Sequence, residues 1–424
     1  MGKSLSVIPY YGGKSRMARF IAERLDYIST SIFITLFGGG CRELLNKPPH
    51  AIEIYNEYDY GLCALMETLS NPDTAQKFID TLYYETNPTK EQFLKAKEVY
   101  DRYRVDLVEE CTKDIKKVFK KYIKSIKQKE IDDLLEILWE TLQNEESEDI
   151  KKDNKFIKEM ECMDEEARKE LYIAFSNWKN IKKSAEIGGL PSYPDLINKR
   201  VSKLDLAMAT YIIYTLSFSG IGKAYSKGKF TKESYKKHIL KLYDCANRLN
   251  GISVWNLDAM SFFRQEMYDS MYEEDSGIDI RKNNILYEYL NNPNVMMFAD
   301  PSYISPIEEE KILSHVGIKL HDIDIEHGNM VCDVLEEAFQ NKKIPKNLGS
   351  TYVRSFGYKE QEYFLKGICN AKCKVMICNY DLQLYNRYLT SEKGWTKETY
   401  RTKTTVVGYT EKSKNRLEVI WRNY

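Results

Sequence analysis

The sequence of 424 residues has no run of about 20 consecutive apolar residues, the length that a membrane-spanning helix needs. Its first residues, Met1 to Ser4, are not followed by the apolar stretch of a secretory signal peptide. Both absences predict a soluble, cytoplasmic protein. Net charge is absent as well, because 63 basic residues balance 63 acidic ones. A nucleic-acid partner would therefore have to bind a local basic patch.

The nine cysteines lack the dense, even arrangement of a disulfide framework, so we expect them to be reduced. Cys369, Cys373 and Cys378 come close to the spacing of metal ligands. However, no histidine follows them, and Cys378 lies within an apolar, strand-like run. We therefore predict buried cysteines and no metal site.

A nucleoside-triphosphate loop is also missing, although residues 12–15 read Gly-Gly-Lys-Ser. That motif needs a glycine five residues before the second one, and Ile8 stands there. What remains is a glycine turn and Lys14 ahead of a helical pattern, a place suited to an anionic group such as a carboxylate.

The hydrophobic content of 43% and the charged content of 30% are typical of a globular protein. Short apolar runs alternate with helical patterns, which predicts a mainly parallel α/β sheet. The predicted strands span residues 32–37, 51–55, 252–258, 295–299, 374–378 and 416–424. Between them, residues 62–250 are rich in Lys, Glu, Tyr and Leu and predict a helical insertion. The sheet domain would then be discontinuous, formed by residues 1–61 and 251–424.

The first predicted strand ends in the glycine turn Gly38-Gly39-Gly40, and a helical segment follows. Strand, glycine turn and helix form the first half of a nucleotide-binding βαβ unit, in which missing side chains let the backbone approach a ligand. Glu57 lies 18 residues beyond Gly39, close to the distance at which an acid reaches ribose hydroxyls.

The predicted strand at residues 295–299 is followed directly by Asp300-Pro301-Ser302-Tyr303. Parallel strands deliver such residues to the crevice at their carboxyl ends, where ligands bind. Asp300 would supply a hydrogen-bond acceptor there, Pro301 a rigid turn, and Tyr303 a ring on which a planar ligand could stack. An ordinary turn is the alternative, since Asp, Pro and Ser are common turn residues.

Two basic segments are candidates for nucleic-acid contact. Residues 116–127 form a basic amphipathic run with interleaved aromatics, for which a solvated helix face is the alternative. Residues 217–230 combine glycines, lysines and a tyrosine predicted to be exposed, a pattern that suits phosphate contact and insertion of a ring into a base stack. A plain surface loop is the alternative for this second segment.

Together these features resemble the Dam-type class of DNA N6-adenine methyltransferases. Six segments carry the resemblance in the family's order: Tyr10 to Lys14, Phe37 to Asn46, Asn56 to Asp59, Asp300 to Tyr303, Lys374 to Asp381 and Arg416 to Tyr424. The glycine-rich loop at 218–230 is similar to the family's DNA-contacting hairpin. Three positions differ from the pattern: Cys41 replaces a loop glycine, Glu57 an aspartate, and Ser302 the second proline of the catalytic motif.

The resemblance implies a Rossmann-like methyltransferase sheet with an inserted, mainly helical DNA-recognition domain, and S-adenosyl-L-methionine as cofactor. The implied catalytic residues are Asp300, Pro301 and Tyr303. The implied cofactor-binding residues are Tyr10, Lys14, Phe37, Gly38, Gly39, Gly40, Glu57, Asp258 and Asp300, with Asp258 accepting from the adenine amino group. The DNA-binding residues would be Lys223, Tyr225, Lys227 and Lys229.

The implied activity is transfer of a methyl group to N6 of an adenine flipped out of double-stranded DNA. The protein would be a monomer in a bacterial cell or a phage-infected host, with a possible restriction endonuclease partner. Two alternatives stay open from the residues. One is the same chemistry on RNA or on a protein amide, and the other is a DNA-binding protein whose catalytic centre has decayed.

Overall fold

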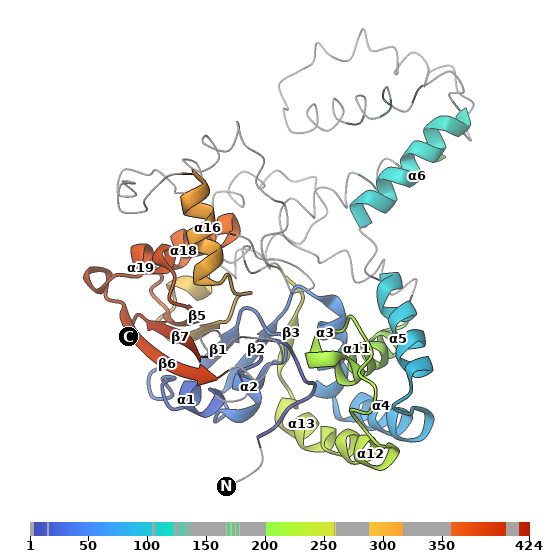
Figure 1. The fold of residues 1–424 in the computed structure, drawn as a ribbon, viewed down its shortest axis with the longest axis horizontal. Helices are drawn as coiled ribbons and strands as arrows, with labels where there is room; N and C mark the ends of the chain where they lie inside the picture. Colours follow the sequence, from blue (N-terminus) through green and yellow to red (C-terminus); the bar gives the residue numbers. More distant parts are fainter. Residues whose placement is uncertain are drawn as a thin grey trace. The chain divides into compact units, whose positions relative to one another are not determined.

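The computed structural model describes residues 4–14, 17–103, 107–122, 201–257, 288–316, 358–403 and 415–424, with residue 259 and isolated positions between 127 and 178. The chain forms two compact units, Met1–Tyr100 with Val201–Tyr424, and Asp101–Arg200 (Figure 1). Residues 62–100 and 201–250 thus belong to the same unit as the sheet, which differs from the predicted insertion of residues 62–250. The reason is their apolar surface, since most of the helix Tyr60–Ser70 is buried.

The first unit contains a seven-stranded sheet with the order β3-β2-β1-β4-β5-β7-β6. Its strands are β1 Ile32–Thr35, β2 Ile52–Asn56, β3 Ser253–Trp255, β4 Val295–Ala299, β5 Lys374–Tyr380, β6 Thr396–Lys403 and β7 Asn415–Arg422. Neighbouring strands from β3 to β5 pair in parallel, as predicted, while β7 is antiparallel to β5 and β6. The order β3-β2-β1-β4-β5 is that of a doubly wound, Rossmann-like sheet.

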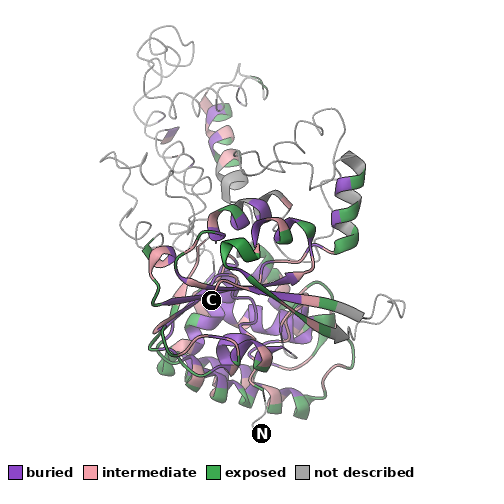
Figure 2. Cartoon of the chain, turned by 90° about the vertical axis from the view of Figure 1, so that its left-hand side faces the viewer, coloured by how far each residue is buried: buried purple, intermediate pink, exposed green. Residues whose placement is uncertain are grey.

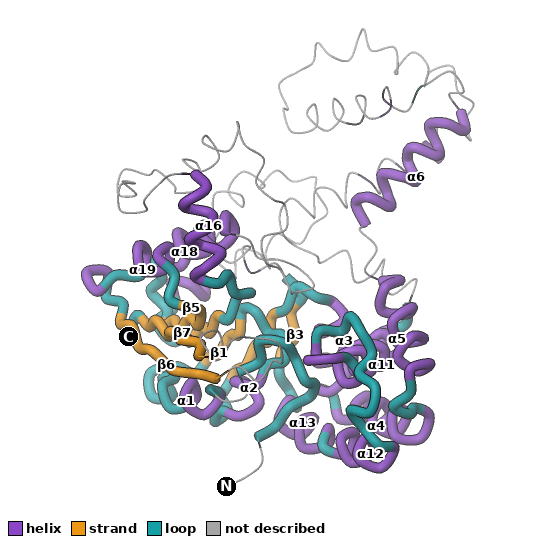
Figure 3. The backbone as a smooth tube through the Cα atoms, viewed as in Figure 1, coloured by secondary structure: helices purple, strands orange, loops and turns teal. Residues whose placement is uncertain are grey.

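The core lies on both faces of this sheet, and every residue of β4 is fully buried (Figure 2). A continuous apolar run is what a strand covered on both faces requires. Helices α18 (Tyr358–Ile368) and α19 (Gln383–Tyr388) pack apolar side chains against one face. Helices α1 (Ala18–Ala22) and α2 (Arg42–Asn46) lie on the other side of the sheet (Figure 3).

The buried helix Tyr60–Ser70 is α3, and it packs against α4 (Pro72–Glu85), α11 (Lys203–Leu216) and α13 (Leu242–Leu249). Helix α12 (Lys232–Leu240) packs against α4 and α13. Two further helices are α5 (Lys90–Tyr103) and α16 (Pro306–Val316), and Glu309 of α16 accepts from the amides of Gln383 and Leu384 in α19. Helix α11 leads into the glycine-rich loop, and Ser202 caps it by accepting from the amide of Asp205.

In the second unit, α6 spans Leu107–Tyr122 and contains the start of the basic amphipathic run. Its apolar residues Ile115 and Phe119 are buried. Lys117 pairs with Asp114 at 3.1 Å, and Lys121 with Glu170 at 2.6 Å. Both lysines are exposed and form ion pairs within the unit, as expected for a solvated helix face.

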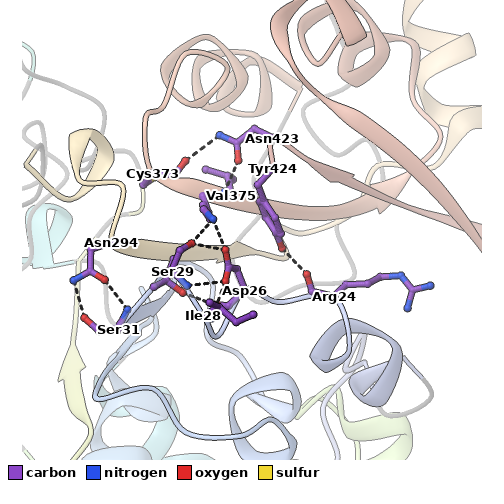
Figure 4. A network of polar contacts seen from close by, with 12 residues as sticks. Arg24, Asp26, Ile28, Ser29, Ser31, Asn294, Cys373, Val375, Asn423 and Tyr424 are labelled. Atoms are coloured by element: carbon purple, nitrogen blue, oxygen red, sulfur yellow. Dashed lines mark hydrogen bonds and ion pairs between the residues drawn. The ribbon is translucent and has the colours of Figure 1, made fainter.

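The amino-terminal edge of the sheet is closed by side-chain amides of the chain itself (Figure 4). Asn294 accepts from the amide of Ser31 at 2.8 Å, just before β1 and β4 begin. Asn423 accepts from the amide of Val375 at 2.7 Å, and the hydroxyl of the next residue, Tyr424, donates to a backbone carbonyl near α1. These bonds satisfy backbone groups at the amino ends of β1 and β5; in open α/β sheets, ligands bind at the opposite, carboxyl ends of the strands.

A buried ionic cluster joins the start of β2 to α2 and α13. The Glu53 carboxylate accepts from both terminal nitrogens of Arg248, at 2.6 and 2.9 Å, and also pairs with Lys47. The Lys47 side chain is 0% exposed, and burial lowers its pKa to about 8. Although burial raises the pKa of Glu53, Arg248 and Lys47 lower it overall.

Replacing Glu53 with glutamine is expected to cost about 3–5 kcal/mol of unfolding free energy, because it leaves two buried cations without their carboxylate. The folded-state pKa of Glu53 is lowered from its usual 4.5. The stability difference between wild type and Glu53→Gln is therefore fully present above pH 4.5, and it is lost as pH falls through the folded-state pKa. Denaturant unfolding at several pH values measures it. Glu91→Gln, which breaks an exposed pair with Lys95, should leave the midpoint unchanged; an equal effect of both variants would contradict the account.

Candidate functional site

The strand order reverses between β1 and β4, and the two candidate motifs follow these two strands. The glycine turn comes after β1, and Asp300 comes directly after β4. Thr35 pairs with Phe298, and the amide of Leu36 donates to the carbonyl of Phe298 at 2.9 Å. The carboxyl ends of adjacent strands at a reversal of strand order form the ligand crevice of open α/β sheets. Motifs far apart in the sequence therefore meet at that crevice.

The glycine turn is packed under two tyrosine rings. A Cβ on Gly38 would lie 2.2 Å from the Tyr55 ring, and one on Gly40 would lie 2.9 Å from Tyr10. Gly39 adopts a φ of +47°, and its carbonyl accepts from the Tyr55 hydroxyl at 3.0 Å. The absence of side chains at Gly38 and Gly40 lets the side chains of Tyr55 and Tyr10 pack directly against the backbone of the turn.

Cys41 stands where the sequence resemblance places a loop glycine, and its side chain does not fill the turn. Its side chain is buried, with Sγ 3.9 Å from the sulfur of Met66 in α3. The residue takes a left-handed φ of 39°, and its amide donates to the carbonyl of Gly38 at 2.8 Å. The substitution is absorbed by the core.

Glu57, at the end of β2, is the acid that faces the glycine turn. Its carboxylate accepts from the amide of Gly39 at 2.7 Å and from the amide of Asp59 at 3.0 Å. Burial raises the pKa of Glu57 to about 7. Asp59 has a structural role, because it caps α3 and accepts from the Tyr100 hydroxyl at 2.5 Å. Because burial disfavours the ionised form of Glu57, further hydrogen-bond donors to its carboxylate would stabilise that form.

Asp300 lies beside a buried lysine from the N-terminal segment. Lys14 Nζ is 2.8 Å from Asp300 Oδ1 and 3.8 Å from Glu418 Oε2 on β7. The same Nζ is 4.4 Å from the ring centroid of Tyr303. We expected Lys14 to meet a ligand carboxylate, whereas the structure pairs it with the carboxylate of Asp300.

The charges around Asp300 oppose one another. Burial raises the pKa of Asp300, Lys14 lowers it, and Glu418 raises it further, with a net upward direction. A third carboxyl, Glu43 of α2, accepts from the Thr35 hydroxyl at 3.1 Å. Burial raises the pKa of Glu43 to about 7, with a smaller contribution from Asp300. Lys14 is the cation that offsets this concentration of carboxyl groups.

Tyr303 is held by side chains from β5 and β7. Its ring centroid is 4.8 Å from that of Tyr380, at an interplanar angle of 70°. Its hydroxyl donates to Glu418 at 3.4 Å. Sequence reasoning missed Glu418, which the antiparallel pairing of β5 with β7 places opposite Tyr380 and so next to the motif.

The glycine-rich loop at 217–230 divides into exposed and inward-facing residues. Lys223 and Lys227 are exposed, as expected. In contrast, the Tyr225 hydroxyl donates to the carbonyl of Pro88 at 2.8 Å, and the expectation of an exposed ring is wrong because this bond holds it half-buried. Lys229 donates to the carbonyl of Ser217 at 2.8 Å, and burial lowers its pKa to about 8.

This loop packs against the N-terminal segment that covers the glycine turn. A Cβ on Gly220 would lie 2.3 Å from the carbonyl oxygen of Pro9, so glycine is required there. The rings of Tyr10 and Tyr214 lie 5.4 Å apart. Phe218 is 54% exposed and is an aromatic that sequence reasoning missed. The loop and the glycine turn therefore both contact the N-terminal segment at Tyr10.

Three further predicted residues remain. Phe37 is half-buried, with its ring centroid 5.7 Å from that of Phe364 in α18. Pro301 is buried directly after Asp300. Asp258 lies outside the described residues, so its predicted contact with the cofactor stays a prediction.

No protein-family model matches the chain, and a search of curated proteins finds no match. Within the described ranges, no helix is long and apolar enough to cross a membrane. No group of three His, Cys, Asp or Glu side chains that could hold a metal ion occurs among the described residues.

Proposed function

We propose that this protein is an S-adenosyl-L-methionine-dependent methyltransferase that modifies N6 of adenine in DNA. One observation carries the proposal: Asp300-Pro301-Ser302-Tyr303 and the glycine turn with Glu57 adjoin the same reversal of strand order. An acceptor-rich turn and a nucleoside-binding turn are needed side by side when a methyl group passes from a nucleoside cofactor to a base.

The residues present fit a nucleoside cofactor. Burial raises the pKa of the half-buried Glu57 to about 7, and donors from ribose hydroxyls would stabilise its ionised form. Gly38 to Gly40 supply a turn without side chains next to that carboxyl. When bound, S-adenosyl-L-methionine supplies a methyl group on a positively charged sulfur.

The chain's own residues would act on the adenine. The N6 lone pair is delocalised into the ring, so accepting hydrogen bonds from both N6 hydrogens favours a nucleophilic, pyramidal nitrogen. Asp300 would accept one hydrogen and the carbonyl of Pro301 the other, which is preorganised electrostatics aimed at the charge that develops on N6. The Tyr303 ring would stack on the flipped base.

Lys14 has a supporting role in this proposal. Burial and Glu418 raise the pKa of Asp300, and the Lys14 ammonium, 2.8 Å away, opposes this shift and so favours the ionised form that would accept from N6. After transfer, Asp300 would take the proton that N6 loses.

DNA is favoured over a protein amide as the acceptor because of the loop at 217–230. Lys223 and Lys227 are exposed near Phe218, an aromatic that is 54% exposed. Exposed lysines suit phosphate contacts, and an exposed ring suits insertion between bases. The burial of Cys41 beside Met66 removes one sign of a decayed centre.

Purified protein, incubated with DNA and S-adenosyl-L-methionine labelled in its methyl group, tests the proposal. Digestion of the DNA to nucleosides is expected to yield labelled N6-methyladenine. RNA of the same sequence is a control for the acceptor. Labelled methylcytosine alone, or label in RNA but not in DNA, would overturn the proposal.

The affinity for S-adenosyl-L-methionine is expected to weaken about tenfold between pH 8 and pH 6. Binding to ionised Glu57 competes with its protonation, and the pKa of Glu57 is raised to about 7. Titration calorimetry across this range measures the change. Glu57→Gln should bind more weakly at pH 8 and should lose this part of the pH dependence; an unchanged slope would contradict the assignment.

The salt dependence of DNA binding is expected to flatten when Lys223 and Lys227 are both replaced with glutamine. Each phosphate contact contributes about 0.9 to the slope of log K against log salt, so the slope should fall by about 2. Lys393→Gln, in the turn Ser391–Lys393 before β6 and thus at the amino-terminal edge, is the control. Equal slopes for the double variant and the wild type would refute this surface.

A further inference from the structure

Ser302 stands where the Dam-type pattern has a second proline, and its carbonyl has a specific partner. Gln361 of α18 donates from Nε2 to the carbonyl oxygen of Ser302 at 3.0 Å. The Gln361 residue is 0% exposed. A buried amide therefore holds the catalytic turn at the position where a second pyrrolidine ring would have restricted the backbone.

The Gln361 amide is itself oriented by the end of β5. Asn379, also 0% exposed, donates from Nδ2 to Gln361 Oε1 at 3.4 Å. The Asn379 Oδ1 accepts from the amide of Tyr380 at 2.7 Å, and the Tyr380 ring packs on that of Tyr303. The contacts form a closed path, since Tyr303 follows Ser302 in the chain.

We propose that Gln361 is a positioning residue for methyl transfer, which fixes the turn after Asp300 in place of the second proline. The proposal rests on the proposed methyltransferase function. It also explains why the end of β5 carries Asn379: this side chain fixes which way the Gln361 amide points, so that its NH₂ group, and not its oxygen, faces the Ser302 carbonyl.

The physical reason is the accuracy that the reaction needs. Pro301 presents the second acceptor for N6, and the Ser302 carbonyl belongs to the next peptide group. A serine leaves this backbone more conformational freedom than a proline would. Misplacement of reacting groups by about 1 Å costs on the order of 10² in rate, so one buried hydrogen bond at this turn can control the chemical step.

The test compares Gln361→Met, Ser302→Pro and the double variant with Tyr388→Phe. Tyr388 of α19 donates to Glu362 of α18 at 2.8 Å. Tyr388→Phe thus removes a buried hydrogen bond next to Gln361 in sequence but leaves the catalytic turn untouched. Four quantities are measured for each protein: kcat with DNA, the affinity for S-adenosyl-L-methionine, the thermal midpoint, and amide hydrogen exchange over residues 300–304.

Gln361→Met is expected to lower kcat by on the order of 10- to 100-fold while changing cofactor affinity less than twofold, because only the acceptor turn is loosened. Exchange over residues 300–304 should become faster. Adding Ser302→Pro to Gln361→Met should restore most of kcat and slow the exchange again. Tyr388→Phe should lower the thermal midpoint without changing kcat at a temperature where it is folded.

The inference is overturned if Gln361→Met keeps wild-type kcat and wild-type exchange, or if Tyr388→Phe lowers kcat equally. Failure of Ser302→Pro to fold would leave the comparison of exchange in Gln361→Met and Tyr388→Phe, which decides the question alone. A wild-type protein that methylates no adenine would overturn the proposed function. In that case, the exchange data would still show whether Gln361 holds the turn.

Discussion

Replacing Asp300 with alanine is expected to lower the rate of methyl transfer to adenine by on the order of 10²–10³, or below detection. The variant loses the carboxylate that would accept a hydrogen from N6 and then take its proton. Cofactor affinity should stay within a few-fold of wild type, because the glycine turn and Glu57 are separate from the carboxylate. Single-turnover kinetics with DNA, together with calorimetry for S-adenosyl-L-methionine, measure both quantities.

Asp300→Asn is the matched control, because it preserves the shape of the side chain and one oxygen acceptor but removes the charge. We expect its rate to lie between those of the wild type and the alanine variant. Loss of cofactor binding in both variants would instead place Asp300 in the cofactor site alone. Full activity of either variant would contradict its role in the chemical step.

Replacing Lys14 with methionine is expected to move the acidic limb of the pH–rate profile upward by about 1–3 pH units. Burial and Glu418 raise the pKa of Asp300, and the Lys14 ammonium, 2.8 Å away, is the larger of two influences that lower it, the other being a hydrogen bond from Tyr303. The reactive form is the carboxylate, so activity is lost as pH falls through the pKa of Asp300. Without Lys14 that loss should begin at a higher pH.

The profile of kcat/KM against pH reports this group in the free enzyme. Lys14→Arg keeps the positive charge and should retain most of the wild-type limb, although its different shape can lower the maximal rate. If methionine lowers the rate equally at every pH, Lys14 has another role. A carboxylate of the cofactor, as we predicted from the sequence, would then be its partner.

Much of the sheet could be predicted because its parallel strands are short apolar runs. The run before Asp300 is buried along its whole length, and the structure confirms it as β4. Strand β6 was missed, since its residues Thr396–Lys403 are polar or charged apart from Tyr400. Such a composition is typical of an edge strand, which uses charge to avoid pairing with other chains.

The pairing of Lys14 with Asp300 could not be predicted, because nothing local in the sequence joins the two residues. Lys14 follows a glycine turn, which suggests an anionic ligand, and only the fold shows that the anion is a carboxylate of the chain. The same holds for Gln361 and Glu418, which reach the turn at residues 300–303 from α18 and β7. The spacing of motifs along the sequence does not predict contacts that depend on the order of the strands in the sheet.

The glycine-rich loop was predicted in part, since composition does not determine the direction of a side chain. Lys223 and Lys227 are exposed, while Tyr225 and Lys229 are held by backbone carbonyls of Pro88 and Ser217. A tyrosine in a polar loop can use its hydroxyl to reach buried backbone as easily as it can face solvent. Phe218 instead presents the exposed ring.

The most direct test of the central claim is single-molecule sequencing of DNA from cells that express this chain, beside cells that express Asp300→Ala. The wild type is expected to leave N6-methyladenine at one recurring sequence, and the variant is expected to leave none. Absence of methylated adenine with a folded, cofactor-binding wild-type protein, or the same pattern in both cell lines, would contradict the assignment of Asp300–Tyr303 as a methyl-transfer centre.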